Sequence, residues 1–408
     1  MKVLTTLLMA AVCSVTLAGC ASSVAPQGGA APAAATADAF APAKVPAGFI
    51  KGADLSTLKE MEDVGYVYKD LNGNPGDCMQ ILKDQGFNYV RLRLWNDPYD
   101  ANGNTYGGGT NDLPTDIALA KRAKALGLKF LLDFHYSDFW TDPGKQFKPK
   151  AWEKLSFEDL NKALYTYTKE TIEAFAKEGV MPDMVQVGNE LNSGMLWPDG
   201  KSWGQNGGEF DRLATLLKSA IQGVRDGGGT DCQIMLHLAE GPKKDTFKWW
   251  FDEITARDVP FDIIGMSMYT WWHGTIPQLK ESMEFCAERY GKEINVVEAA
   301  YAYTLENLDG VENTFTANEE KVSGYPATPE GQAAFFRDLM EAVASVKGGN
   351  GIFYWEPAWK SAPGITWATQ AGMDYTNDHW KEGNTRENQA LFDNDGKLLP
   401  SVKVFNNL

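Results

Sequence analysis

The stretch "MVQVGNE", residues 184–190, carries the pattern on which the fold assignment depends. Its first four residues are apolar except for one glutamine, as in a buried strand, and no turn signal separates them from the Gly-Asn-Glu that follows. Asn189 and Glu190 are therefore expected at the tip of a strand. Polar side chains at the carboxyl ends of strands are typical of barrels of alternating strands and helices, whose active sites lie at that end.

Seven other stretches have the same apolar, β-rich character. The candidate strands are "FIKGADLS" (49–56), "YVRLRLW" (89–95), "KFLLDFHYS" (129–137), "MVQVGNE" (184–190), "CQIMLHLAE" (232–240), "DIIGMSMYT" (262–270), "INVVEAAY" (294–301) and "GIFYWEP" (351–357). Helical patterns lie between them, for example over 115–127, 158–179 and 330–346. This alternation predicts a single α/β domain, a (β/α)8 TIM barrel. A doubly wound open sheet is the alternative, but no glycine-rich phosphate turn follows an early strand.

Polar and aromatic side chains gather where these strands end, which supports the barrel. They are Asp54, Arg91, Arg93, His135, Asp138, Trp140, Asn189, Glu190, His237, Glu240, Tyr269, Trp271, Trp272, Glu298, Tyr301, Trp355 and Glu356. The amino ends of the strands show no comparable set. We expect the active site at the carboxyl ends of the strands.

Two of these carboxylates stand in strongly apolar surroundings. Glu190 follows the fourth strand, and Glu298 comes directly after Val296 and Val297 in the seventh. A buried carboxylate is costly unless it is paired or used in the chemistry. A single glutamate at a strand end is more often a solvated loop residue, so the argument for function rests on the whole set of residues.

The composition excludes one class of partner and leaves others open. The 408 residues carry a net charge of -16, so the protein has no net positive charge with which to neutralise the phosphates of a nucleic acid. The 13 Trp and 15 Tyr residues fit either core packing or stacking platforms for a flat apolar ligand face. Three cysteines lie in the folded part, Cys78, Cys232 and Cys286, and they favour buried thiols, with one disulfide possible.

The first 46 residues read as a processing signal and a linker. Lys2 precedes an apolar run too short to span a membrane, and the run ends in "LAGC" (17–20), which resembles the lipobox of bacterial lipoproteins. We expect a signal peptide over 1–19, lipidation of Cys20 and an Ala/Pro-rich flexible tether over 20–46. Ordinary secretory cleavage nearby is the alternative. Ala21 lacks the acidic character that resembles an inner-membrane retention signal, so we expect an outer-membrane anchor in a Gram-negative cell envelope.

From about residue 48 to the end, the chain resembles glycoside hydrolase family 53, the endo-β-1,4-galactanases of clan A. The stretches that carry the resemblance are "GADLS" (52–56), "GYVYKDLNG" (65–73), "VRLRLWNDP" (90–98), "LDFHYSDFWTDPGKQ" (132–146), "GNELNSGMLWPDG" (188–200), "MLHLAEG" (235–241), "VVEAAYAYT" (296–304), "YWEPAW" (354–359) and "ENQALFD" (387–393). One departure is Ala299, where the family leads us to expect a hydroxyl residue.

The resemblance implies retaining, endo-acting hydrolysis of β-1,4-galactan, including the type I arabinogalactan side chains of pectin. It makes Glu190 the acid/base and Glu298 the nucleophile, and it implies no cofactor for catalysis. We expect Arg91 and a hydrogen bond from Tyr269 to keep Glu298 ionised. We also expect the tips of the fourth and seventh strands to face each other from opposite sides of the barrel. Asn189 should bind the sugar 2-hydroxyl. The predicted substrate-binding residues are Asp54, Arg91, Arg93, His135, Asp138, Trp140, Asn189, Trp197, His237, Tyr269 and Trp355, and further candidate sugar platforms are Trp95, Trp271 and Trp359.

A segment after the seventh strand is similar to a calcium-binding loop of bacterial family members. The predicted Ca²⁺ ligands are Asn307, Asp309, Val311 and Asn313, with Asn384 and Glu387 closing the site. The ion would be structural. A plain polar loop is the alternative, and Asn307 stands where the family leads us to expect Asp.

Two other functions stay open at this point. One is another clan A endo-glycanase activity, such as a mannanase or a cellulase, on the same barrel. The other is a lipid-anchored glycan-binding protein without turnover. In every case we expect a monomer whose partner is a polysaccharide.

Overall fold

The computed structural model describes residues 38–203 and 209–407. The predicted signal peptide, the lipidation site Cys20 and most of the predicted tether lie outside the described residues. The last part of that tether, residues 38–46, is described. Within it Ala43 is buried and donates its backbone N–H to the carbonyl oxygen of Val404 at 2.9 Å. No helix among the described residues is long and apolar enough to cross a membrane.

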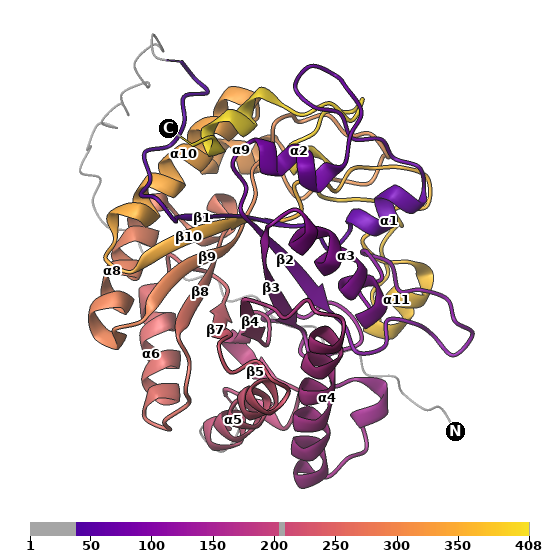
Figure 1. The fold of residues 1–408 in the computed structure, drawn as a ribbon, viewed down its shortest axis with the longest axis vertical. Coiled ribbons are helices and arrows are strands. Elements are labelled where there is room, and N and C mark those ends of the chain that lie inside the picture. The colour runs from indigo at the N-terminus through magenta and orange to yellow at the C-terminus, as the bar shows by residue number, and fades with distance from the viewer. Residues whose placement is uncertain (1–37, 204–208, 408) are drawn as a thin grey trace, which may run out of the picture. The chain divides into compact units, whose positions relative to one another are not determined.

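Eight parallel strands close into a barrel in the order β1-β10-β9-β8-β7-β4-β3-β2, as Figure 1 shows. Their bounds are β1 Ile50–Asp54, β2 Tyr89–Leu94, β3 Lys129–Phe134, β4 Met184–Val187, β7 Gln233–Leu238, β8 Ile263–Met268, β9 Glu293–Ala299 and β10 Gly349–Tyr354. The predicted TIM barrel and all eight predicted strands are confirmed. Each predicted stretch except the one at 351–357 starts within one residue of its strand, and all run past the strand's end by one to three residues.

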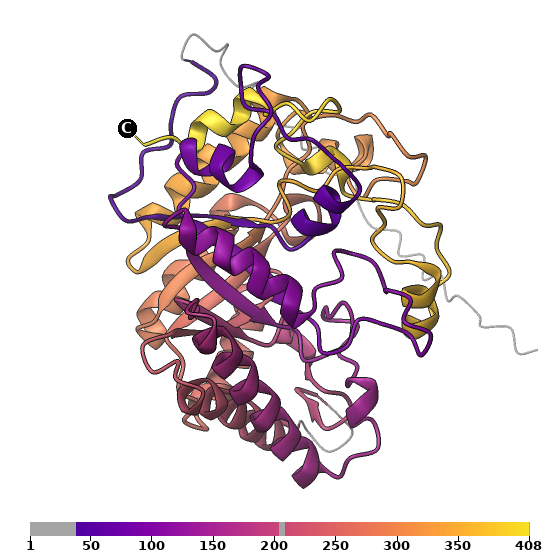
Figure 2. The ribbon, with the colours of Figure 1, turned by 45° about the vertical axis from the view of Figure 1, so that its right-hand side comes forward.

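Helices follow the strands and cover the barrel's outer surface (Figures 1 and 2). The longer ones are α3 Leu113–Ala125, α4 Phe157–Lys177, α5 Phe210–Asp226, α6 Lys244–Thr255, α8 Ile276–Tyr290 and α10 Pro329–Ser345. The shorter ones are α1 Leu58–Asp63, α2 Cys78–Asp84, α7 Thr270–His273, α9 Ala317–Ser323 and α11 Gln370–Thr376. The three helices predicted by range correspond to α3, α4 and α10. After β4 a small hairpin of β5 Gly194–Met195 and β6 Gly200–Lys201 also forms, which the sequence did not predict.

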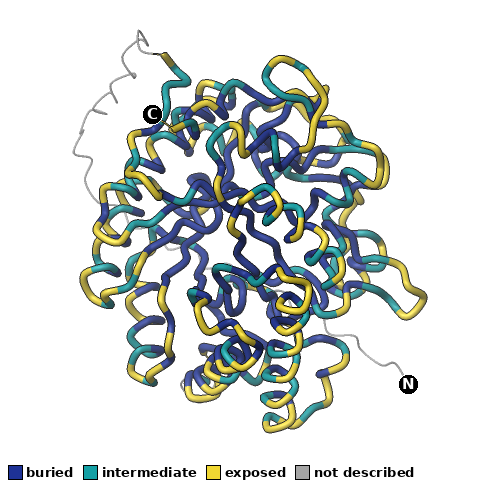
Figure 3. The backbone as a smooth tube through the Cα atoms, in the orientation of Figure 1, coloured by how far each residue is buried: buried dark blue, intermediate teal, exposed yellow. Residues whose placement is uncertain are grey.

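The inside of the barrel changes from apolar to charged along the strands. One interior cluster consists of Tyr89, Leu131, Met184, Met235, Ile263, Val297 and Phe353. Because side chains alternate across a strand, the next inward positions lie two residues further on. On β2, β3, β4 and β7 those positions are Arg91, Asp133, Gln186 and His237, which are all buried. The strands are largely buried and are drawn dark blue in Figure 3. The layer of buried polar side chains lies toward their carboxyl ends.

The three cysteines of the folded part are all buried free thiols: Cys78, Cys232 and Cys286. The prediction of buried thiols is confirmed, and the disulfide that the sequence left open does not form among them.

Candidate active site

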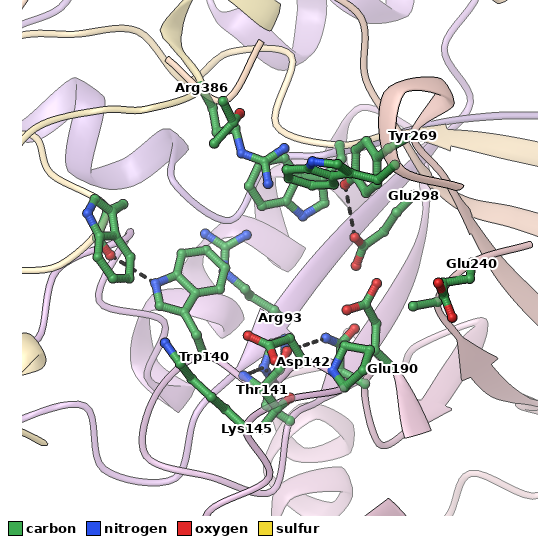
Figure 4. Close-up of a pocket in the computed structure, with 18 of the residues that line it drawn as sticks. Arg93, Trp140, Thr141, Asp142, Lys145, Glu190, Glu240, Tyr269, Glu298 and Arg386 are labelled. Atoms are coloured by element: carbon green, nitrogen blue, oxygen red, sulfur yellow. Dashed lines mark hydrogen bonds between the residues drawn. The ribbon is translucent and has the colours of Figure 1, made fainter. Parts of the chain in front are cut away.

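A cleft of about 590 Å³ opens at the carboxyl ends of the strands, where the sequence predicted the site. Its lining comes from the ends of β2, β3, β4, β7, β8, β9 and β10 and the segments that follow them. Figure 4 shows Glu190 and Glu298 pointing toward one another within this cleft. The tips of their strands β4 and β9 therefore face each other, as expected from the sequence, and the two strands stand three places apart around the ring of eight.

The backbone turns sharply to present Glu190. Beyond the end of β4, Gly188 has φ +84° and Glu190 itself has φ +48°, a region that costs a non-glycine residue about 1–3 kcal/mol. The φ of Gly188 is one that other residues rarely adopt, and a Cβ there would also lie 2.5 Å from Leu191 Cδ2, so both the backbone and the packing favour glycine. The buried Gln146 side chain donates to the carbonyl oxygens of Asn189 at 2.8 Å and of Glu190 at 3.3 Å. These bonds hold the strained turn in place.

The carboxylate of Glu298 receives both contacts that the sequence predicted. Arg91 Nη2 lies 2.9 Å from its Oε1, and the Tyr269 hydroxyl donates to its Oε2 at 3.0 Å. Charge-assisted contacts of this kind favour the ionised carboxylate.

Arg91 joins Glu298 to a buried polar network. Its guanidinium lies 2.8 Å from Asp54 on β1 and 2.8 Å from Asp133 on β3, and it donates to Gln186 and Asn189 on the β4 side. Both carboxylates and the guanidinium are at most 1% exposed. The network fixes the position of the arginine that pairs with Glu298.

The two glutamates differ in what surrounds them. Burial, followed by the neighbouring charge of Glu298, raises the pKa of Glu190 well above its ordinary value, and a hydrogen bond from Ser267 opposes the rise. Burial also raises the pKa of Glu298, but Arg91 and Tyr269 act against it. No cation of residues 38–203 and 209–407 lies within ion-pair distance of Glu190, so Glu190 retains the proton while Glu298, paired with Arg91, is ionised. Such a pair titrates together, and its apparent pKa values belong to both groups.

A second arginine shapes the other wall of the cleft. Arg93 Nη1 lies 2.5 Å from Glu356 Oε1, and its guanidinium stacks over the Trp140 ring with 4.2 Å between Cζ and the ring centroid. Beside it, His135 accepts the backbone N–H of Thr141 at Nδ1, so its Nε2 faces Asp133 Oδ2 at 3.3 Å as a donor. These contacts hold the side chains in fixed orientations at the cleft surface.

The structure brings together most of the predicted site residues, but four lie outside the cleft. Those that line it are Arg91, Arg93, His135, Trp140, Asn189, Glu190, Tyr269, Glu298 and Trp355. Asp54 and His237 lie beneath it, both fully buried. Asp138 is buried and accepts the backbone N–H of Lys150 at 2.7 Å. Trp197 lines a separate hollow of about 430 Å³ with Phe147 and Tyr375.

The aromatic candidates divide in the same way. Trp359 and Trp355 line the cleft, whereas Trp95 and Trp271 are buried and are not part of its lining. Trp272, which is 49% exposed, and Trp367 line the cleft as well. Of these two, Trp367 was not among the sequence candidates.

Three residues important to the site were not among the sequence candidates. Asp133 and Ser267 occupy inward positions of β3 and β8, and the two-residue alternation of those strands could have revealed them. Arg386 lies in the long segment after β10, where no strand pattern marks it. Its Cζ is 5.0 Å from the ring centroids of both Trp272 and Trp355. No acidic side chain among the described residues forms an ion pair with it, so its N–H groups can serve a substrate oxygen.

The predicted calcium ligands lie close together, but protein donors occupy most of them. Asp309 accepts the backbone N–H groups of Val311 at 2.8 Å and Asn384 at 2.6 Å, and the Asn307 side chain donates to the Val311 carbonyl oxygen. Glu387 Oε1 accepts the N–H of Leu308 at 2.5 Å. Within residues 38–203 and 209–407, no three His, Cys, Asp or Glu side chains converge as a metal site.

Known proteins share both the sequence and the fold. A sequence profile of glycosyl hydrolase family 53 matches residues 50–405. An endo-beta-1,4-galactanase of Bacillus subtilis (strain 168) is 40% identical over 378 residues, covering 88% of this chain and 85% of that protein. An arabinogalactan endo-beta-1,4-galactanase of Cellvibrio japonicus (strain Ueda107) is 38% identical over 366 residues, covering 88% and 90%.

A solved structure agrees with these sequence matches. The Ignisphaera aggregans GH53 catalytic domain matches with a TM-score of 0.82 and 43% identity, covering 89% of this chain and 99% of that chain. Family profile, relatives and structure thus span the barrel and the cleft with both glutamates. The chain belongs to glycosyl hydrolase family 53.

Proposed function

We propose that this glycoside hydrolase is a retaining endo-β-1,4-galactanase, with Glu190 as acid/base and Glu298 as nucleophile. The observation that carries the proposal is the pair of facing carboxyl groups in different electrostatic settings: Glu298 is paired with Arg91, whereas Glu190 forms no ion pair with any described residue. Retaining enzymes use such a pair, with the carboxyl groups about 5–5.5 Å apart. The galactanase names of relatives 38–40% identical support the substrate.

The first step would form a glycosyl-enzyme. Glu298 attacks the anomeric carbon of a galactosyl unit, and the bond from that carbon to the glycosidic oxygen breaks. Glu190 gives its proton to this oxygen, which leaves as the 4-hydroxyl of the next galactose. The Tyr269 hydroxyl and Arg91 hold the attacking carboxylate, and Asn189, anchored by Arg91 at 3.1 Å, is placed beside Glu190 to bind the 2-hydroxyl.

The second step would return the enzyme to its starting state. Esterification removes the negative charge of Glu298, so the pKa of Glu190 falls and its carboxylate can act as a base. It takes a proton from water, and the water oxygen attacks the anomeric carbon as the bond to Glu298 breaks. Two inversions give net retention.

The remaining predicted residues would act in two ways. Arg93, His135, Trp140 and Trp355 line the cleft and would contact sugar rings or hydroxyls. Asp54, His237 and Asp138 would support these residues from beneath or beside the cleft. Trp197, in its own hollow, would contact a longer galactan chain beyond the cleft.

One assay separates this function from its alternatives. The purified protein is incubated with pectic β-1,4-galactan, β-1,4-mannan and carboxymethylcellulose, and new reducing ends are measured. An endo-galactanase should produce new reducing ends from galactan, and its products should be oligosaccharides that arise from internal cleavage. New reducing ends mainly from mannan or carboxymethylcellulose would indicate another clan A activity. A protein that binds a polysaccharide but produces no reducing ends from any of the three would be a glycan-binding protein.

We also propose that the segment over residues 307–313 holds a structural Ca²⁺ with Asn384 and Glu387. Two oxygens support it: Glu387 Oε2 and Asn313 Oδ1 are buried and have no protein partner. Calcium prefers such carboxylate and carbonyl oxygens. The ion would play no part in bond cleavage.

We further propose that the mature protein is a monomer that starts at a lipidated Cys20 and is held at the outer membrane by a tether. The motif "LAGC" and the Ala/Pro-rich stretch after it support this proposal. The barrel domain would then reach its polysaccharide substrate from a surface-bound position.

A further inference from the structure

A chain of hydrogen bonds runs from a buried histidine to the carboxyl group of Glu190. His237, at 0% exposure, has its Nε2 2.8 Å from the hydroxyl oxygen of Ser267. That hydroxyl donates to Glu190 Oε1 at 2.7 Å. Neither His237 nor Ser267 belongs to the cleft lining, so neither is placed to touch substrate.

The backbone fixes which nitrogen of His237 carries the proton. Two N–H groups point at Nδ1, the backbone N–H of Glu190 at 3.3 Å and the side-chain amide of Gln186 at 3.1 Å. Asn189 Oδ1 also lies 3.1 Å from Nδ1, but this oxygen already accepts hydrogen bonds from Arg91 and Gln186. Nδ1 is therefore the acceptor, and Nε2 carries the hydrogen and donates to Ser267. Burial and then the charge of Arg91 lower the pKa of His237 well below its ordinary value, which keeps the ring neutral.

The direction of the next bond follows from the first. Because the Ser267 oxygen receives the His237 N–H, its own hydrogen has one acceptor in the described contacts, Glu190 Oε1. A carboxyl oxygen that carries the proton is a weaker acceptor than the carbonyl oxygen of the same group, so a proton on Oε1 would weaken the bond from Ser267. The arrangement therefore favours the proton of Glu190 on Oε2, the oxygen that does not contact Ser267.

We propose that His237 and Ser267 are positioning residues that dictate which oxygen of Glu190 carries the catalytic proton. The proposal rests on the acid/base role proposed for Glu190. The bond from Ser267 also stabilises the negative charge that Glu190 acquires when it donates the proton. Both effects act on proton transfer, and neither acts on the attack by Glu298.

Other charged groups around Glu190 act in addition to this bond. Those that face it from the neighbouring elements are Glu298 on β9, Arg91 on β2, Asp142 after β3, Tyr269 after β8 and Arg386 after β10. None of them is changed in the test below, so a shift in pH dependence can be assigned to Ser267.

The test compares Ser267→Ala with the wild-type enzyme on two substrates. Galactan needs a proton on its leaving oxygen, whereas a dinitrophenyl β-1,4-galactobioside has a leaving group that departs without one. We expect kcat/KM on galactan to fall about tenfold, as loss of a charge-assisted hydrogen bond predicts. On the aryl substrate kcat/KM should stay within about twofold, since it reports only formation of the glycosyl-enzyme.

The pH dependence of kcat/KM separates an effect on the pKa of Glu190 from a purely structural effect, because a purely structural change would leave the pH limbs in place. Ser267 lowers the pKa of Glu190 by donating to its carboxylate, so its removal should raise that pKa. The alkaline limb of kcat/KM on galactan should therefore move to higher pH in Ser267→Ala. Ser267→Thr, which keeps a hydroxyl donor, should restore the wild-type limb.

Two further variants control for the loss of a buried group. Ser282→Ala on α8 removes a buried serine hydroxyl that has no partner, and it should change neither substrate nor pH limb. His237→Gln offers an amide N–H to Ser267 and a carbonyl oxygen to the Glu190 N–H. It should retain more galactan activity than His237→Ala.

Three outcomes would overturn the proposal. They are an equal loss on both substrates, an alkaline limb that stays in place, and full galactan activity in Ser267→Ala. A wild-type enzyme that cleaves the aryl galactobioside but not galactan would instead contradict the proposed function, so the two failures can be told apart.

Discussion

Arg91 is the residue at which the charges of the site meet. Three carboxylates lie within 2.9 Å of its guanidinium, from Asp54, Asp133 and Glu298. Only Glu298 of the three reaches the cleft. Burial raises the pKa of Glu298, Arg91 lowers it, and the charges of the two buried aspartates raise it again, so the nucleophile paired with Arg91 is more basic than an isolated ion pair would make it.

The pH dependence of galactan hydrolysis should report this balance. Activity requires an ionised Glu298 and a protonated Glu190, so kcat/KM should be bell-shaped. Asp133→Asn removes a negative charge that raises the pKa of Glu298, so the acid limb should move to lower pH. The measurement is kcat/KM against pH for both proteins. An acid limb that moves to higher pH, or not at all, would show that Asp133 does not act on Glu298 through its charge.

Residues of the site differ in how far the sequence could reveal them. Glu190 and Glu298 follow apolar strand residues, so their burial and placement could be inferred. Ser267 could have been found from the alternation of its strand. Arg386 could not, because its position depends on the path of an irregular segment after β10 that no periodic pattern constrains.

The strands of the barrel close where β1 meets β10, and glycine makes that contact possible. Ile50 pairs with Gly351, and a Cβ on Gly351 would lie 2.5 Å from the Ile50 carbonyl oxygen. A backbone atom cannot move aside as a flexible side chain can. The sequence patterns predicted both strands but not this close approach, because register depends on how the barrel closes.

Gly351→Ala should therefore destabilise the barrel. We expect the free energy of unfolding to fall by about 1–3 kcal/mol or more, as for other overpacked cores. The measurement is the urea midpoint, with Gly76→Ala as control, since a Cβ there meets only ordinary contacts at 3.4 Å. Equal midpoints for the two variants would mean that β1 and β10 tolerate a side chain at their junction.

The long segments after β9 and β10 are the elements that the proposed calcium would join. A ligand that binds only the folded state stabilises it by about 2.7 kcal/mol at a hundredfold excess over its Kd. Chelation should lower the melting temperature by several degrees, and added Ca²⁺ should restore it. Asp309→Ala should melt like the chelated protein and ignore further chelator. A melting curve that chelator leaves unchanged would mark residues 307–313 as a plain polar loop.

At the scale of the whole molecule, the catalytic domain and the proposed anchor should be separable functions. Cys20→Ser removes the only thiol that the "LAGC" motif offers for lipidation, so the protein should leave the membrane fraction. Its specific activity on galactan should not change, because the cleft lining found in the described part of the chain begins at Arg91. The measurement is activity and protein amount in membrane and soluble fractions. A variant that stays in the membrane fraction would contradict the lipidation site.

The domain as a whole was more predictable than its site. Eight strand patterns with helices between them leave few architectures, because parallel strands joined by helices must be covered on their outer face. The sequence also predicted that the tips of β4 and β9 face each other, and the two strands stand three places apart around the ring of eight. The roles of Asp54 and His237 could not be inferred from the sequence. The strand pattern indicates which side chains face inward, but not whether they line the cleft or lie beneath it.

The roles of the two glutamates are tested most directly by azide rescue of Glu190→Ala and Glu298→Ala with a dinitrophenyl β-1,4-galactobioside. Without Glu190, the activated substrate still forms the glycosyl-enzyme, which then accumulates because no base activates water. Azide should attack this intermediate and yield a β-galactobiosyl azide. Without Glu298, azide should displace dinitrophenolate from the substrate itself and yield the inverted α-galactobiosyl azide. An α-azide from Glu190→Ala together with a β-azide from Glu298→Ala would show that the two roles are reversed.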